Sequence, residues 1–158
     1  MKKRLLFITI FFALNTFSQK EANFWYFGRN AGIDFNTSPP SNITSGAIST
    51  LEGCSSFSDA SGSLLFYTDG TKVWNKDNQI MTYTDGSPAD NLRGNPSSTQ
   101  SGMIIPKPGT SSIYYLFTVG NNRNPAFDLY TIDMSLNGGL GQLIDENNDG
   151  NFSENLAS

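Results

Sequence analysis

The sequence contains no histidine and only one cysteine, and each scarcity removes a class of chemistry. Without histidine the chain can form neither a Ser-His-Asp triad nor a histidine-based zinc site, and it lacks the commonest general base. Cys54 has no second cysteine for an intrachain disulfide and no histidine for a Cys-His nucleophile pair. We interpret Cys54 as a small, mostly buried apolar side chain; a reactive thiol and a partner cysteine in a downstream part of the protein are the alternatives.

Long hydrophobic runs are also scarce, and the longest one covers residues 5–14. Lys2, Lys3 and Arg4 precede it and a polar segment, residues 15–19, follows. This three-part layout is typical of a secretory signal peptide, which we predict to cover residues 1–18; a buried first strand or helix leaves the three cations unexplained. A run of about ten residues is shorter than the roughly twenty of a membrane-spanning helix, so the sequence predicts secretion or cell-surface display without a transmembrane anchor in this chain.

Basic residues are fewer than acidic ones, 10 against 14, and the net charge of the whole chain is −4. Cleavage after Ser18 would remove three cations and no acid, which would take the net charge from −4 to −7. An acidic surface argues against nucleic acid or anionic lipid as a partner. It leaves room for a divalent cation, which crowded carboxylates can bind.

The portion from residue 19 to residue 158 reads as all-β. Short runs of alternating or aromatic-rich residues recur between turn-forming clusters, and none of them keeps a helical period over ten residues. We expect strands at residues 24–27, 32–35, 54–58, 64–68, 72–75, 103–105, 113–119 and 128–133. The connections at residues 59–62, 69–70, 76–78 and 108–110 carry the Asp, Asn and Gly residues that tight turns require, which predicts antiparallel β-meanders.

The expected strands also repeat with an offset of about fifty residues. Residues 53–57, 64–70 and 72–75 align with residues 102–106, 114–120 and 128–131. In a partial third copy, residues 25–28 stand for the middle strand and residues 33–36 for the strand after it. Such a period is typical of propeller blades, and closure takes at least about four blades. We therefore expect residues 19–158 to form about three blades of an incomplete β-propeller that continues beyond this chain.

Several strings resemble the N-terminal region of large exported proteins of gliding-type bacteria. They are NFWYFGRNAGIDFN at 23–36, EGCSSFSDASGSLLFYTDGTKVWN at 52–75, GNPSSTQSGMIIPKPG at 94–109, YYLFTV at 114–119 and DMSLNGGLG at 133–141. The resemblance implies a propeller-like domain, followed in the parent protein by PKD-type or other immunoglobulin-like modules and a type IX secretion sorting domain. It implies no catalytic residues, and this chain stops at Ser158, before any such module.

Aromatic side chains are the candidates for ligand binding, because a flat ring can stack on a sugar. The candidates are Trp25, Tyr26, Trp74, Tyr83 and Tyr130. Aromatic residues of strands belong more often to the core. Tyr83 is the least bound to an expected strand, so we predict it as the ligand-binding residue.

One motif suggests a metal. Asp145, Asn147 and Asp149 stand at positions one, three and five of a loop with Gly150 at position six, as at the start of a calcium-binding EF-hand loop. The pattern then fails, because position twelve is Leu156 and no flanking helices are expected, although Glu154 is a candidate substitute ligand. We predict calcium as the possible cofactor at these three residues; a polar turn is the alternative.

Two classes of function fit these observations. The first is a non-catalytic exported surface or adhesion module that binds a surface glycan or protein. The alternative is a carbohydrate-active or other hydrolytic propeller whose catalytic acids lie partly outside this chain. The repeated Tyr-Thr-Asp-Gly at 67–70 and 83–86 offers two carboxylates, but turn aspartates are the simpler interpretation. No catalytic constellation forms, so the sequence favours the first class.

We predict that the mature protein begins at Gln19 or within a residue or two of it. Thr16 and Ser18 supply small side chains before the cut, after the apolar run. N-terminal mass analysis of the exported protein should find this new terminus. An intact Met1 on exported protein would contradict the prediction.

Overall fold

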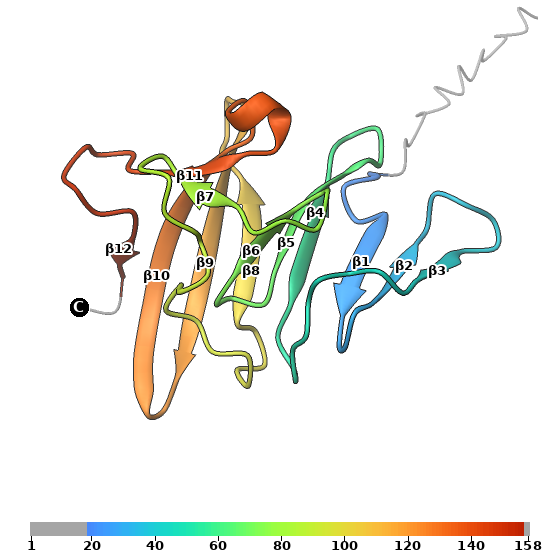
Figure 1. Cartoon of the computed structure of the whole chain (residues 1–158), viewed down its shortest axis with the longest axis horizontal. Coiled ribbons are helices and arrows are strands. Elements are labelled where there is room, and N and C mark those ends of the chain that lie inside the picture. Colours follow the sequence, from blue (N-terminus) through green and yellow to red (C-terminus); the bar gives the residue numbers. More distant parts are fainter. Residues whose placement is uncertain (1–18, 157–158) are drawn as a thin grey trace, which may run out of the picture.

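The computed structural model describes residues 19–156, and the predicted signal peptide lies outside them. The described chain is all-β, as predicted, with one 3₁₀ turn, η1 (Asn137–Gly139). Three sheets form an open array that does not close into a propeller within residues 19–156 (Figure 1). The middle sheet lies between the other two.

The N-terminal and middle sheets are three-stranded antiparallel meanders. In the N-terminal sheet the order is β1 (Phe24–Phe27), β2 (Ala31–Asp34) and β3 (Ser41–Ile43). In the middle sheet the order is β4 (Ser55–Ser58), β5 (Leu64–Thr68) and β6 (Val73–Asn75). β4 contacts a strand of each neighbouring sheet, β1 on one side and β8 on the other.

The C-terminal sheet is larger and carries the candidate site. Its strands are β7 (Thr82–Tyr83), β8 (Gly102–Pro106), β9 (Ile113–Asn121), β10 (Asn124–Asp133), β11 (Gln142–Ile144) and β12 (Glu154–Asn155). The order is β7-β11-β10-β9-β8, and β12 pairs with β10 beside this path. The pairs are antiparallel except for β7 and β11, which run parallel.

The predicted turns are confirmed. Gly62, Gly70, Asn78 and Gly109 all adopt positive φ angles, which glycine and asparagine tolerate best. Two features require glycine at position 70. Its φ angle is positive, and a Cβ atom there would lie 2.3 Å from the carbonyl oxygen of Ser101. Side-chain carboxylates then hold the turns: Asp69, for example, accepts hydrogen bonds from the backbone N–H groups of Thr71 and Lys72.

The strand order of the repeat is found in two of its three copies. The strands β4, β5 and β6 have the same order and antiparallel pairing as β8, β9 and β10. The registers differ by two residues, because Thr68 pairs with Ser55 whereas the aligned Thr118 pairs with Gly102, the residue aligned with Gly53. The prediction for the first copy was wrong: residues 24–27 form the first strand, and residues 31–34 form the middle one. The cause is β3, which pairs with residues 31–34 on the side away from β1 and so gives them the middle place in the sheet.

The middle sheet is covered on both faces. On one face the ring of Tyr67 stacks on Tyr26 of β1, with centroids 4.3 Å apart, and on Trp74 of β6 at 5.4 Å. On the other face Phe66 meets Tyr114 of β9 edge-on at 5.6 Å. The two cores therefore lie on either side of β5, because successive residues of a strand point to opposite faces.

The buried Tyr67 hydroxyl has partners. It accepts a hydrogen bond from the Ala47 N–H at 2.9 Å and donates one to Oδ1 of Asn78 at 2.7 Å. Burial raises the pKa of Tyr67 to about 12, so the hydroxyl stays protonated and can donate.

The outer face of the C-terminal sheet is apolar and exposed. Alternation along β9 and β10 sends Leu116 and Ile132 into the core and their neighbours outward. The outward side chains include Met103, Ile105, Val119 and Phe127, and Phe117 stacks on Phe127 at 5.9 Å. A contiguous apolar face of this kind normally packs against something.

We predict that residues 19–158, produced alone, show β-type circular dichroism and self-associate through this outer face. Replacing Phe117 with serine should lower the apparent mass in sedimentation velocity, because a polar side chain at the centre of the face opposes its burial. Leu51→Ser is the matched control: Leu51 is 75% exposed and lies outside the sheets, so its loss should change nothing. A monomeric wild type with a sharp, reversible melt would contradict the prediction.

A buried carboxylate of the C-terminal sheet, Asp128, pairs with a partly exposed arginine. The Asp128 side chain is completely buried, and Nε of the half-exposed Arg93 lies 3.3 Å from its Oδ2. No described residue donates a well-aligned hydrogen bond to either carboxylate oxygen. Thr118, opposite Asp128 on β9, is also buried, and its hydroxyl likewise lacks a hydrogen-bond partner among the described residues. Burial raises the pKa of Asp128, and Arg93 offsets only part of that rise.

This raised pKa predicts a pH effect on stability. The folded state binds the proton more tightly than the unfolded chain does, so Asp128 lowers the free energy of unfolding as the pH rises from about 4 towards neutrality. Urea unfolding of the Phe117→Ser variant should show the free energy of unfolding falling over this pH range. Adding Asp128→Asn should remove the part of that fall that comes from Asp128. Equal pH slopes in the two proteins would contradict the prediction.

Candidate functional site

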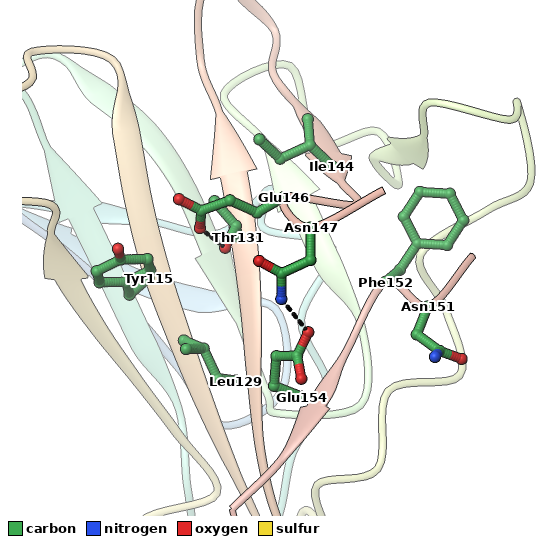
Figure 2. A pocket seen from close by; sticks show the side chains of 9 residues that line it. All are labelled: Tyr115, Leu129, Thr131, Ile144, Glu146, Asn147, Asn151, Phe152 and Glu154. Atoms are coloured by element: carbon green, nitrogen blue, oxygen red, sulfur yellow. Dashed lines mark hydrogen bonds between the residues drawn. The ribbon is translucent and has the colours of Figure 1, made fainter. Parts of the chain in front are cut away.

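A cavity of about 260 Å³ lies between the outer face of the C-terminal sheet and the loop that joins β11 to β12 (Figure 2). The strands supply one wall and the loop supplies the other. The lining residues are Tyr115, Leu129, Thr131, Ile144, Glu146, Asn147, Asn151, Phe152 and Glu154. We call this cavity the β11–β12 pocket.

The strand wall follows from alternation and register. Tyr115 points outward because its neighbours Tyr114 and Leu116 are buried in the core. Thr131 stands directly opposite Tyr115 on β10, so both reach the same face. Leu129, two residues before Thr131, adds an apolar side chain to that face.

The loop wall is folded by its own acidic and amide residues. The carboxylate of Asp145 accepts hydrogen bonds from the N–H groups of Asp149 at 3.3 Å and Gly150 at 2.8 Å. Asn148 and Gly150 adopt positive φ angles, which turns the chain back towards the sheet. The pairing of Glu154 with Leu129 then closes the loop over the pocket.

The electrostatic centre of the pocket is Glu146. Its carboxylate accepts a hydrogen bond from the Lys107 ammonium and another from the Thr131 hydroxyl, the latter at 2.9 Å. The Lys107 hydrogen bond lowers the pKa of Glu146, and the same contact raises the pKa of Lys107. Glu146 is therefore held ionised. On the other side of the pocket, Asn147 donates to Oε1 of Glu154 at 2.7 Å (Figure 2).

The three predicted calcium ligands have different places. Asn147 lines the pocket and bonds Glu154, whereas Asp145 and Asp149 accept backbone N–H groups within the loop. Across residues 19–156, no three His, Cys, Asp or Glu residues form a group that could hold a metal ion. A cation at this loop would therefore depend on Asn147, Glu154 and backbone oxygens as much as on the two aspartates.

Tyr83 lies one layer behind the pocket. It belongs to β7, and its ring packs against Phe152 at 4.6 Å, so it supports a wall that it does not itself form. Burial raises the pKa of its hydroxyl. Of the other aromatic candidates, Tyr26, Trp74 and Tyr130 are core residues, and Trp25 is 52% exposed.

The other candidate residues hold structure. Asp69 and Asp85 both cap turns, each accepting a backbone N–H two residues on at 2.8 Å. Cys54 is half-buried, and burial raises the pKa of its thiol, which disfavours the reactive thiolate. Sequence reasoning missed Tyr115, Glu146, Asn151 and Phe152 as pocket residues. The available signal was the outward position of Tyr115 in an alternating strand.

Comparisons with family models, curated proteins and solved structures find no match to this chain. No helix among the described residues is long and apolar enough to cross a membrane.

We predict that any calcium bound by Asp145, Asn147 and Asp149 is held weakly, with a Kd of about 10⁻⁴ to 10⁻³ M, because the usual bidentate glutamate is missing at position twelve. Calorimetry should show heat at millimolar calcium for the wild type and none for the Asp145→Ala, Asp149→Ala double variant. If the wild type and the double variant give equal heats, or if the wild type gives none, these residues form a polar turn and not a calcium site.

Proposed function

We propose that this chain is a non-catalytic, exported module of a larger cell-surface protein, and that the β11–β12 pocket binds its ligand, a surface glycan or protein. The observation that carries the proposal is the pocket itself. Tyr115, Phe152 and two aliphatic side chains form its walls, and carboxylate and amide groups stand around them. Most of the lining residues are polar or charged, so the pocket suits a ligand that is oriented by hydrogen bonds and charge and contacts a few apolar side chains.

We also propose that the three sheets are successive blades of a propeller-like domain whose other blades lie in the parent protein. Two features support this reading. Each of the first two sheets is built from consecutive strands, and β4 neighbours both β1 and β8. The exposed outer face of the C-terminal sheet is the surface that a further blade would cover. The resemblance to exported proteins of gliding-type bacteria supports a parent sorted by type IX secretion.

The hydrolytic alternative rests on Glu146 and Glu154, which line the same pocket. Glycoside cleavage needs one carboxyl that is protonated at the start, with its pKa raised. Glu146 has the opposite environment, because Lys107 lowers its pKa. Glu146 is therefore unsuited to the role of the general acid.

The test is a titration of the chain with neutral oligosaccharides and with lysine-containing peptides, followed through the NMR signals of the pocket's aromatic rings. We expect a ligand from this set to shift Tyr115 and Phe152 and to be recovered chemically unchanged. Phe152→Ala should abolish binding, whereas Phe35→Ala, a change at a 40% exposed ring next to β2, should not. Cleavage of the ligand, or no ligand at the pocket, would refute the proposal.

A further inference from the structure

We infer that the β11–β12 pocket recognises an alkyl ammonium group, and that its ligand is a lysine side chain on a partner protein. The inference rests on the proposed binding function and names the chemistry of the ligand. Three features of the pocket carry it: its unused hydrogen-bonding capacity, the ammonium that it already holds, and its size and charge.

Two of the pocket's side-chain donors are already used, and two of its acceptors are not. The Thr131 hydroxyl donates to Glu146, and the Asn147 amide donates to Glu154. No described residue donates to the second carboxylate oxygen of Glu154 or to the side-chain oxygen of Asn147. A ligand that brings donors can fill these two acceptors, and an ammonium brings three donors and no acceptor.

The chain shows how this pocket accommodates an ammonium. Lys107 bonds Glu146 while its Nζ lies 5.5 Å from the centroid of the Tyr115 ring, a cation–π distance. On the far side of the same cavity the lining includes a second carboxylate, Glu154, and a second aromatic residue, Phe152 (Figure 2). Within the described residues, no lysine or arginine pairs with Glu154.

Size and charge select among donor-rich ligands. The cavity of about 260 Å³ is smaller than the roughly 300–1,000 Å³ of pockets for drug-sized ligands, so it suits one side chain better than a disaccharide. Residues 145–154 carry four acids and no base, and the chain is acidic overall. That field attracts cations and repels anionic glycans.

The experiment is an NMR and calorimetric titration of the full chain with Nα-acetyl-lysine methylamide. Its matched probe is Nα-acetyl-norleucine methylamide, which has the same alkyl chain without the charge. We expect the lysine probe to shift the Tyr115 and Phe152 signals with an affinity that falls as salt is added, and the norleucine probe to shift nothing. Glu154→Gln should weaken binding about fivefold, the size of a partly exposed ion pair.

Asp77→Asn is the control, because it removes the same charge at an exposed residue outside the pocket and should leave the affinity unchanged. Equal binding of the two probes, or unchanged affinity in Glu154→Gln, would overturn the inference. Binding of free spermidine without the lysine probe would overturn the assignment to a protein side chain. If only a neutral oligosaccharide shifts the NMR signals of the pocket, the inference is wrong and the proposed function still holds. If no ligand shifts these signals, both are wrong.

Discussion

The two-sided burial of the middle sheet is the constraint on which the rest of the structure depends. Three short strands are marginal by themselves, and they gain stability when both faces are covered. Tyr67 and Phe66 are neighbours in β5, yet one ring packs on the N-terminal sheet and the other on the C-terminal sheet. Each of the outer sheets is thus held through one face, and its other face is turned away from the middle sheet.

This arrangement explains where binding capacity is found. The core uses one face of the C-terminal sheet for packing, so the outer face is available for other contacts. Part of that face stays bare and apolar, and part is covered by the loop between β11 and β12. The loop turns an exposed strand surface into a small, acceptor-rich pocket, because its own Asp145 and Gly150 fold it back towards β10.

Much of the fold could be predicted from the sequence, and the candidate site could be predicted only in part. The strands at 64–68 and 113–119 and the turns at Gly62 and Gly70 follow from local residue patterns. The prediction for residues 25–28 was wrong because an aromatic run indicates a strand but does not fix the position of that strand in the sheet. Tyr83 was chosen as the aromatic residue farthest from an expected strand, but it belongs to β7 and packs against Phe152; its contact with a ligand stays a prediction.

The sequence by itself determined the all-β class, the turn positions and the acidic loop at 145–150, since alternation and positive φ angles depend on adjacent residues. Only the tertiary structure decided that β12 returns to β10 and places Glu154 beside Asn147. It also decided that Lys107, distant in sequence, neutralises Glu146. Such pairings depend on which faces are buried against each other, and that choice is made by the whole chain when it packs its cores.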